Sequence, residues 1–245
     1  MLKSLIGLIK VVENWPEVLL SRYFRLPIKE IRLRNGIKFS ATSIDHAEIS
    51  MLVDIWHKQV YTPPFFSIDS QDIIIDVGAN KGYFSVFAAT QARNGKVYAF
   101  EPVTELAACA LENSKLNRLN NLTIINKALW NESGEKPFYL STNSGGHSMR
   151  AKPSSYAEIT VPTIRLDEFC KAKQINIIDL LKLDCEGAEY DILMTLDKEF
   201  LDQIKKISME IHDFGGYHHN QILDFLEKNN FKTKELKGYV YAWRD

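Results

Sequence analysis

The chain has 245 residues, 45% of them hydrophobic and 25% charged, which are proportions of an ordinary globular protein and exclude a largely disordered one. Its 30 basic and 31 acidic residues give a net charge of −1, so nothing indicates a nucleic-acid partner. The cysteines, Cys109, Cys170 and Cys185, are odd in number and widely spaced, which excludes a disulfide framework or a zinc cluster. We therefore expect a reducing, cytoplasmic location.

The first segment, residues 1–70, is predicted to precede the main domain. Residues 2–12 form an apolar stretch that is too short to cross a bilayer and lacks a signal-peptide cleavage pattern. We expect an amphipathic helix docked on its own domain, with a homodimer contact or a peripheral membrane contact as alternatives. Asn35-Gly36, between Ile28–Arg34 and Lys38–Ala41, predicts a hairpin with a type I′ turn. Asp45–Val60 has apolar residues at helical spacing and predicts a covering helix.

The second segment, residues 71–245, alternates between strand and helix patterns. Ile73–Val77 is a β-branched run typical of a strand buried on both faces, and a glycine turn and a helix follow it. Further strands are predicted at Lys96–Phe100 and Leu122–Asn126. The helix between these two strands is predicted to bury Val103, Leu106, Ala107, Ala110 and Leu111.

The alternation is interrupted between Gly134 and Leu166. Strand patterns at Lys136–Ser141 and Glu158–Ile164 flank a polar loop, Ser141–Ser155, and predict an antiparallel excursion. Parallel alternation is then predicted to resume with strands at Leu180–Asp184 and Lys206–Ile211, and helices from Glu189 and over Gln221–Lys228. The last two strands, Phe231–Leu236 and Tyr239–Trp243, are too close in sequence for a helix between them and should pair antiparallel. The pattern predicts an α/β fold with a mostly parallel, Rossmann-like sheet.

The glycine turn predicts an adenosine-containing ligand. Gly78 and Gly82 allow a sharp turn and a close approach of backbone to ligand, and Glu101, at the end of the next strand, can accept hydrogen bonds from ribose hydroxyls. The spacing differs from the G-x-G-x-x-G pattern of dinucleotide sites, and Asp76 would repel a pyrophosphate. S-adenosylmethionine carries an ammonium and a sulfonium instead of phosphate, so the sequence favours it over NAD.

A second polar group lies where two later strands end. Asp184 and Glu186 follow one strand, and Glu210 and His212 end the next, so all four should meet at one sheet edge. His212 or Glu210 could remove a proton from an acceptor hydroxyl, although a structural role for His212 is equally compatible with the pattern. The same four side chains could bind a metal, but they lack a compact ligand motif, and we predict no metal site. Glu189 is expected to cap its helix.

With these motifs assembled, the chain resembles the FkbM-type S-adenosylmethionine-dependent methyltransferases. The resemblance covers about Ile73 to His212 and rests on the ordered set DVGANKGYFS, AFEP, NSGGHSM, TIRLDEF, KLDCEGAEYDIL and MEIH. It implies the seven-stranded class I methyltransferase fold, with helices on both faces and a terminal antiparallel hairpin. It also implies Asp184 and Glu186 beside the transferred methyl group. The expected cofactor-binding residues are Asp76, Gly78, Ala79, Asn80, Gly82, Tyr83, Phe84, Glu101, Pro102, Lys127, Ala128 and Asp184.

The family mostly methylates hydroxyl groups, so the resemblance implies O-methylation of a sugar, a glycan or a small metabolite. The acceptor does not follow from the fold. Tyr61, Ser148 and Met149 are candidate acceptor contacts, with a mobile surface loop as the alternative for the last two. A non-catalytic cofactor-binding module, an NAD-dependent oxidoreductase and a nucleic-acid methyltransferase are the competing interpretations. The last is disfavoured because the chain lacks an N-P-P-[YF] motif.

Overall fold

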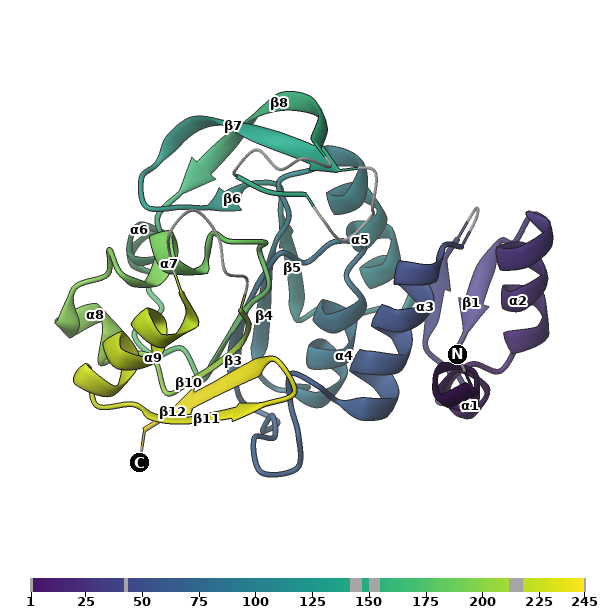
Figure 1. The fold of residues 1–245 in the computed structure, drawn as a ribbon, viewed down its shortest axis with the longest axis horizontal. Coiled ribbons are helices and arrows are strands. Elements are labelled where there is room, and N and C mark those ends of the chain that lie inside the picture. The colour runs from purple at the N-terminus through teal and green to yellow at the C-terminus, as the bar shows by residue number, and fades with distance from the viewer. Residues whose placement is uncertain (1, 42–43, 142–146, 150–154, 212–217, 245) are drawn as a thin grey trace.

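The computed structural model describes residues 2–41, 44–141, 147–149, 155–211 and 218–244. A seven-stranded sheet lies at its centre (Figure 1). Its strands are β3 (Ile73–Val77), β4 (Lys96–Phe100), β5 (Leu122–Ile125), β9 (Leu180–Leu183), β10 (Lys206–Glu210), β11 (Lys232–Leu236) and β12 (Tyr239–Trp243). The order across the sheet is β11-β12-β10-β9-β3-β4-β5.

The sheet is parallel except at one edge. All neighbouring strands from β10 to β5 run parallel, whereas β12 pairs antiparallel with both β10 and β11. This arrangement confirms the expected class I methyltransferase fold with its terminal hairpin. Because the parallel strands share one direction, the segments that follow β3, β4 and β9 all emerge at the same edge of the sheet.

Helices cover both faces of the sheet. Consecutive residues of β3 point to opposite faces, so Ile74 and Ile75 pack into two separate apolar clusters. One face carries α4 (Tyr83–Gln91) and α5 (Thr104–Leu116) (Figure 1). The helices packed in the other cluster are α6 (Leu166–Lys173), α7 (Glu189–Leu193), α8 (Lys198–Leu201) and α9 (His219–Lys228).

The buried side of α5 differs from the sequence prediction at one position. Leu111 was expected in the buried stripe but is 43% exposed. The buried face passes instead through Ala110 and continues to Asn113 and Ser114. Asn113 is satisfied there because its side chain accepts from the Ser40 backbone N–H at 2.8 Å and donates to the carbonyl of Lys81 at 2.8 Å. A polar residue thus occupies a position that apolar periodicity assigns to leucine.

The N-terminal segment packs against α4 and α5. Its elements are α1 (Leu2–Val11), α2 (Trp15–Phe24), β1 (Glu30–Arg32), β2 (Lys38–Ser40), α3 (His46–Val53) and the π-helix Asp54–Lys58. The ring of Phe39 lies 4.8 Å from that of Tyr83, and the ring of Trp56 lies 5.2 Å from that of Phe87, measured between centroids. The N-terminal segment and α4 therefore share one apolar cluster.

Helix α1 is docked on α3, as expected. A Cβ atom on Gly7 would lie 2.6 Å from Val53 Cγ1, which shows how closely the two helices approach, and Leu8 and Val12 are fully buried. Helix α2 was not predicted. Within the described ranges, no helix is long and apolar enough to cross a membrane.

The predicted hairpin is confirmed, but its predicted turn type is wrong. Strands β1 and β2 pair antiparallel, and the Leu33 N–H donates to the Ile37 carbonyl at 2.7 Å. Gly36 donates to the Leu33 carbonyl at 3.0 Å and has φ 88°, whereas Asn35 does not have positive φ. A type I′ turn needs positive φ at both central residues, which this hairpin lacks. Its loop is the three-residue type, residues 34–36, with a left-handed glycine at its last position.

A second, three-stranded sheet carries the predicted antiparallel excursion. Strands β7 (Gly134–Ser141) and β8 (Ser155–Ile164) pair antiparallel, and β6 (Ala128–Leu129) pairs with β8 on the other side. In Figure 1 this sheet lies over the edge at which β4 and β5 end. It therefore forms one wall above the carboxyl ends of the central strands.

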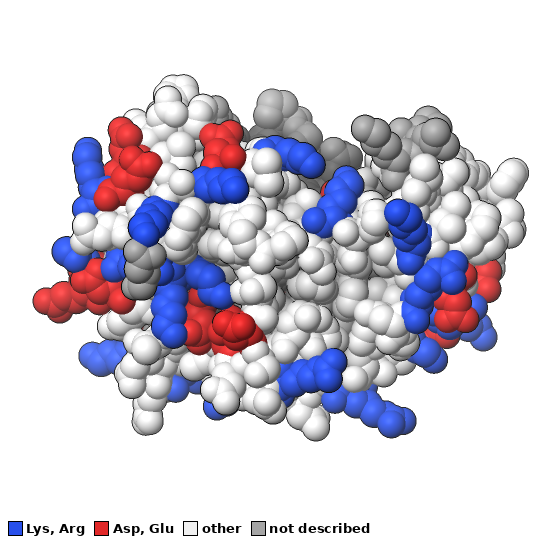
Figure 2. Space-filling model, turned by 90° about the horizontal axis from the view of Figure 1, so that it is seen from below, with Lys and Arg blue, Asp and Glu red and all other residues white. Residues whose placement is uncertain are grey.

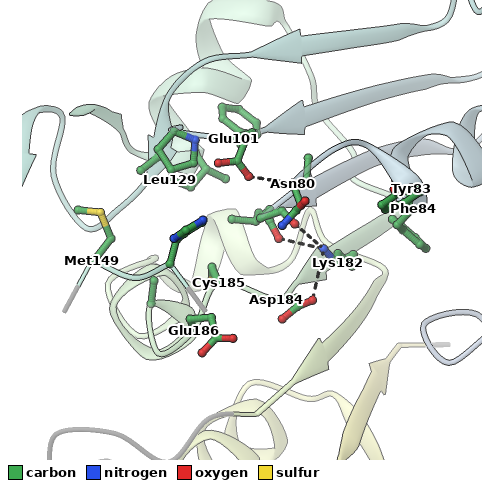
Figure 3. Close-up of a pocket in the computed structure, with 18 of the residues that line it drawn as sticks. Asn80, Tyr83, Phe84, Glu101, Leu129, Met149, Lys182, Asp184, Cys185 and Glu186 are labelled. Atoms are coloured by element: carbon green, nitrogen blue, oxygen red, sulfur yellow. Dashed lines mark hydrogen bonds and ion pairs between the residues drawn. The ribbon is translucent and has the colours of Figure 1, made fainter. Parts of the chain in front are cut away.

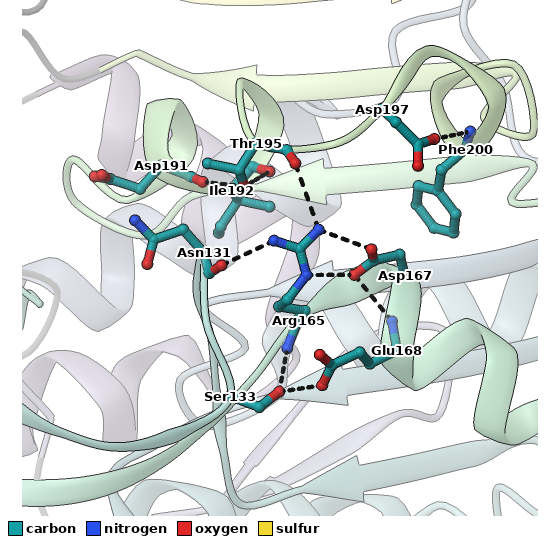
Figure 4. Close-up of polar contacts among 10 residues, drawn as sticks. All are labelled: Asn131, Ser133, Arg165, Asp167, Glu168, Asp191, Ile192, Thr195, Asp197 and Phe200. Carbon is teal, nitrogen blue, oxygen red and sulfur yellow. Dashed lines mark hydrogen bonds and ion pairs between the residues drawn. The ribbon is translucent and has the colours of Figure 1, made fainter.

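Arg165, in the TIRLDEF motif, ties this small sheet to the helical layer (Figure 4). Its guanidinium donates to both carboxylate oxygens of Asp167, at 2.9 and 2.7 Å, and to the backbone carbonyl of Asn131 at 2.9 Å. A longer contact of 3.4 Å reaches the carbonyl of Thr195, beyond α7. The motif therefore has a structural role that spacing alone did not reveal.

Basic and acidic side chains are interspersed on the face seen from below (Figure 2). This face therefore carries no extended field of one sign. Elsewhere in the described part of the chain, charged side chains pair with a neighbour of opposite charge, such as Lys58 with Asp54 at 2.5 Å and Lys205 with Asp179 at 2.7 Å.

Candidate functional site

A pocket opens at the carboxyl ends of β3, β4 and β9, between the small sheet and the N-terminal segment (Figure 3). The space between its lining residues, counting the part open to solvent, is roughly 850 Å³. Its lining residues are Met51, Ile55, Tyr61, Val77, Gly78, Ala79, Asn80, Tyr83, Phe84, Phe100, Glu101, Pro102, Ala128, Leu129, Phe138, His147, Met149, Lys182, Asp184, Cys185, Glu186 and Ala188.

Two glycines shape the turn between β3 and α4. Gly78 has φ 77°, and a Cβ atom there would lie 1.9 Å from the backbone oxygen of Asp184. Gly82 has φ 81°, and its Cβ would lie 3.1 Å from the Cβ of Ala110. Gly78 therefore lets the ends of β3 and β9 meet, while Gly82 lets α4 approach α5. Gly82 lies outside the pocket lining.

Glu101 presents a buried carboxylate to the pocket. It follows β4, is 5% exposed, and accepts hydrogen bonds from the backbone N–H groups of Asn80 at 2.7 Å and Val103 at 2.9 Å. Burial raises the pKa of Glu101 to about 7, although these two hydrogen bonds oppose the rise. Glu101 therefore fixes the glycine turn from one side while it lines the pocket.

Asp76 lies beneath the glycine turn and does not line the pocket. Its carboxylate is fully buried, 2.9 Å from Lys182 Nζ, and it also accepts from the Ser85 hydroxyl at 2.5 Å. Lys182 Nζ donates further to the carbonyl of Gly78 at 3.0 Å. Burial alone would lower the pKa of Lys182, but Asp76 and Asp184 outweigh it and the pKa is raised. The buried pair thus holds the turn from below.

Asp184 is held by two groups from distant parts of the chain. The Tyr61 hydroxyl donates to Asp184 Oδ2 at 2.6 Å, and Lys182 Nζ lies 3.9 Å from the same oxygen. Burial, and then the charge of Asp184, raise the pKa of Tyr61 well above its usual value, so this hydroxyl stays a donor. The Asp184 side chain lines the pocket and is 27% exposed.

The loop after β9 is ordered by Glu189. Its carboxylate accepts from the backbone N–H groups of Cys185 at 3.0 Å and Gly187 at 2.8 Å. Both donors precede α7, so these bonds order the loop and are not the helix cap that was expected. Glu186 has φ 57°, an uncommon conformation for a residue with a side chain. Burial, followed by the charge of Glu189, raises the pKa of Cys185 well above its usual value. Cys185 is therefore a neutral thiol and not a nucleophile.

His147 is a pocket residue that sequence reasoning missed, although it lies within the NSGGHSM motif. Its Nδ1 accepts from the Ser141 backbone N–H at 2.9 Å, and burial lowers the pKa of the ring. A neutral ring that accepts at Nδ1 carries its proton on Nε2, so His147 acts as a donor at that atom rather than a base. Its neighbour Met149 lines the pocket, whereas Ser148 points elsewhere and donates to the Glu186 carbonyl at 2.8 Å.

The pocket brings together most of the residues predicted for the site. Those that line it are Gly78, Ala79, Asn80, Tyr83, Phe84, Glu101, Pro102, Ala128, Asp184, Glu186, Tyr61 and Met149. Asp76, Gly82, Lys127, Ser148 and Glu210 do not line it. Lys182 was missed because a lysine inside an apolar strand gives no sign of its partner. The apolar contributors, such as Leu129 and Phe138, carry no motif that separates them from core residues.

The predicted proton acceptors are only partly described. His212 lies outside the described residues, as do residues 142–146 of the loop near His147. Glu210 ends β10 and is half-buried beside Tyr239, where burial and then the charge of Glu210 raise the pKa of the tyrosine. Among the residues that the structure describes, no group of three His, Cys, Asp or Glu side chains is arranged to hold a metal ion.

Comparison with known proteins adds independent information. The family model described as the methyltransferase FkbM domain matches residues 76–233, more than half of the chain. The chain is 23% identical to 31-O-demethyl-FK506 methyltransferase FkbM of Streptomyces tacrolimicus, over 77% of this chain and 84% of that protein. It is 29% identical to the hexuronic acid methyltransferase AglP of Haloferax volcanii, over 69% of this chain and 67% of that protein.

Two further matches differ in extent. The AMB antimetabolite synthetase AmbE of Pseudomonas aeruginosa is 23% identical over 75% of this chain, which spans only 10% of AmbE. The crystal structure of methyltransferase FkbM from Methylobacillus flagellatus aligns with a TM-score of 0.48 and 12% identity, over 80% of this chain and 53% of that one.

Proposed function

Because the chain belongs to the FkbM methyltransferase family, we propose that it transfers the methyl group of S-adenosylmethionine to a hydroxyl group of a sugar, a glycan or a small metabolite. The observation that carries the proposal is one pocket with two chemically distinct sides. One side combines the glycine turn with the buried carboxylate of Glu101, and the other presents Asp184 and Glu186. The relatives' printed substrates, which include a hexuronic acid, support the acceptor class.

The first side suits the adenosine part of the cofactor. A carboxylate at the end of the second strand of the motif can accept hydrogen bonds from two ribose hydroxyls, and Glu101 occupies that position. Leu129, Phe138 and Phe100 supply apolar surface for an adenine ring. The donors Asn80 and His147 are close enough to the same pocket to bind polar groups of the cofactor. These residues fit the cofactor without rearrangement of the sheet.

The second side of the pocket suits the cationic part of S-adenosylmethionine. Asp184 and Glu186 line this end of the pocket, and Lys182 lies between Asp76 and Asp184, 2.9 and 3.9 Å away. A carboxylate stabilises an ammonium or a sulfonium nearby. When bound, S-adenosylmethionine supplies a methyl group activated by its positively charged sulfur. The role of Asp76 is then to fix the turn through Lys182 rather than to contact the ligand.

Deprotonation of the acceptor is assigned to His212 or Glu210, as the sequence suggested. A hydroxyl is a poor nucleophile until its proton is removed at or before transfer, and the ends of β9 and β10 lie side by side. His147 does not suit this role because its Nδ1 is occupied by the Ser141 N–H. We assign it instead to orientation of an oxygen atom through Nε2–H. The cytoplasmic location, the boundary at residue 70 and a homodimer stay predictions.

Calorimetric titration of the purified chain tests the proposal, with S-adenosylhomocysteine as ligand and NADH as control. Saturable binding of the first alone supports it, and absence of binding by a folded protein overturns it. Glu101→Ala should weaken binding, whereas His212→Ala should leave binding intact and slow turnover on hydroxylated acceptors. Unchanged turnover of His212→Ala would move the base role to Glu210. Binding without turnover on any acceptor would favour the non-catalytic alternative.

A further inference from the structure

Helix α2 and the residues that follow it expose a cluster of large apolar side chains. Of the large apolar residues in the described part of the chain, Phe24 and Tyr23 are the most exposed, at 71% and 63%. Leu20 and Leu26 are 44% and 48% exposed. Leu20, Tyr23 and Phe24 have helical i, i+3, i+4 spacing and so share one face. A contiguous exposed apolar patch of this kind marks an interaction surface.

The opposite face of α2 explains why these residues are left outside. Val18 and Ser21 are buried and attach the helix to the N-terminal segment. The Glu17 carboxylate and the Arg32 guanidinium, 3.0 Å apart, secure its first turn to β1. The helix is therefore fixed in place by one side while the side with Phe24 is held outward. In Figure 1, α2 lies at the end of the molecule farthest from α8.

The charges next to the exposed cluster are mostly positive, and the nearby acidic residue of α2, Glu17, is paired with Arg32 at 3.0 Å. Arg22, Arg25 and Lys29 lie within or beside the cluster, and no acidic residue occurs between residues 18 and 29. Arg22 also lies over the ring of Tyr23, with its guanidinium carbon 5.6 Å from the centroid. Arg25 ends the helix in a left-handed conformation, with φ 54°, and the exposed Leu26 follows it.

From this combination we propose that the surface formed by Leu20, Tyr23, Phe24 and Leu26, with Arg22, Arg25 and Lys29, docks the protein on an anionic lipid bilayer. Aromatic and leucine side chains enter the boundary between headgroups and acyl chains, while arginine and lysine bind the anionic headgroups. The proposal does not rest on the proposed function. In helix α1, Leu8 and Val12 are buried against the protein, so these two side chains do not contribute to the proposed surface.

Charge distinguishes the bilayer from a second copy of the chain. In a two-fold symmetric dimer the surface would face itself, which would bring the three cations of each copy close to those of the partner. An anionic bilayer offers the opposite charge. Helix α5 provides a contrast, because its exposed Leu111 lies next to the acidic Glu112 and its charges are mixed. The α2 surface is therefore matched to an anionic partner in a way that α5 is not.

Vesicle co-sedimentation of the full chain tests the proposal. The probes are vesicles of phosphatidylcholine alone and of phosphatidylcholine mixed with phosphatidylglycerol. We expect binding to the mixed vesicles only, weakened when salt is raised from about 0.1 M to about 0.5 M. Phe24→Ser should lower the partition coefficient between vesicles and water about ten-fold or more, because less apolar surface is buried in the bilayer. Arg22→Gln and Arg25→Gln should each weaken it about five-fold.

The matched control is the double variant Leu111→Ser with Lys115→Gln in α5, which removes one exposed leucine and one cation and should bind like the parent chain. Absence of binding to the mixed vesicles, equal binding to both vesicle types, or unchanged binding of Phe24→Ser would each overturn the proposal. Dimerisation that Phe24→Ser abolishes, measured by light scattering, would overturn it in favour of a second copy. Circular dichroism should show that every variant is folded, since all the substituted residues except the half-buried Arg22 are exposed.

Discussion

The hydroxyl of Tyr61 donates a 2.6 Å hydrogen bond to Asp184, a residue 123 positions further along the chain. Tyr61 follows the π-helix of the N-terminal segment, and Asp184 follows β9. The contact brings the N-terminal segment to the charged side of the pocket. A residue outside the family match, which covers residues 76–233, thus shapes the part of the site proposed to hold the reacting groups.

Tyr61→Phe should lower kcat about ten-fold and leave the Kd for S-adenosylhomocysteine within about three-fold of the parent value. The substitution removes one hydrogen bond to a charged group, and Asp184 loses its fixed orientation. Tyr241→Phe is the control, because that hydroxyl donates to a backbone carbonyl, at Val60, and lies outside the pocket lining. Equal losses of kcat in both variants would show that Tyr61→Phe acts through the stability of the fold and not through Asp184.

Lys182→Met should destabilise the fold by about 3–5 kcal/mol, measured by denaturant unfolding. The substitution leaves the fully buried Asp76 without its countercharge. Asp76→Asn combined with Lys182→Met should recover much of the loss, since no buried charge remains. Lys205→Met is the surface control. The Lys205 side chain is 57% exposed and that of its partner Asp179 is 14% exposed, so we expect this substitution to lower the free energy of unfolding by less than about 1 kcal/mol.

Gly78→Ala and Gly36→Ala form a matched pair that separates backbone strain from steric conflict. Both glycines have positive φ, 77° and 88°, but a Cβ on Gly36 meets no atom within 4 Å. Gly36→Ala should therefore cost about 1–2 kcal/mol, for the left-handed conformation alone. Gly78→Ala adds the 1.9 Å clash with the Asp184 carbonyl and should prevent S-adenosylhomocysteine binding or folding. Equal stability of the two variants would contradict the close approach of β3 and β9.

Binding of S-adenosylhomocysteine should strengthen as pH rises from about 6 to about 8. Ribose hydroxyls donate to the ionised form of Glu101, whose pKa burial raises to about 7 in the free protein. Below that pH the carboxyl is protonated and binding must first remove the proton. Titrations at three pH values should show the trend, and Glu101→Gln should bind weakly with a flat profile. A pH-independent Kd for the parent chain would remove Glu101 from ribose recognition.

The same group gives a stability prediction of opposite sign. Between pH 4.5 and 7 the folded chain holds a proton on Glu101 that the unfolded chain has released. Folding stability from this carboxyl therefore falls as pH rises through that window and is constant above it. In Glu101→Gln this pH-dependent loss of folding stability should be absent. Thermal unfolding of the variant and the parent chain at pH 5 and pH 8 measures the difference.

Arg165→Ala should lower the free energy of unfolding by about 1–3 kcal/mol without changing the Kd for S-adenosylhomocysteine. The substitution leaves Asp167 without its two-point partner and the Asn131 carbonyl without a donor. Asp167 and Arg165 are 28% and 25% exposed, so solvent screens part of the loss. A changed Kd at unchanged stability would show that the TIRLDEF motif contacts the ligand.

The order of the strands and the glycine turn could be predicted because each rests on local signals. Ile73–Val77 reads as a doubly buried strand from its β-branched residues alone, and Lys96–Phe100 follows with the observed bounds. Glu101 could be placed at the pocket because the end of a parallel strand fixes its position. Such features need only sequence spacing and the rule that parallel strands end at one edge.

The features that were missed depend on contacts between distant segments. Asp76 was expected to face the ligand, but its partner Lys182 lies in another strand, and no local pattern pairs them. The hairpin turn was assigned from Asn35-Gly36, whereas the strand pairing that sets the turn type starts at Arg32 and Lys38. Leu111 is exposed, and the buried face of α5 instead includes Asn113, whose partner, the Ser40 N–H, lies in the distant N-terminal segment.

Glu48 connects the first segment to the glycine turn more tightly than its position in α3 suggests. It lies 2.5 Å from Lys81 Nζ and accepts from the Tyr83 hydroxyl at 3.0 Å. These two partners are on either side of Gly82, where the turn becomes α4. A chimera that exchanges residues 1–70 between family members would therefore exchange one support of the cofactor turn along with the acceptor side. Such recombinants need Glu48, Lys81 and Tyr83 transferred as a set.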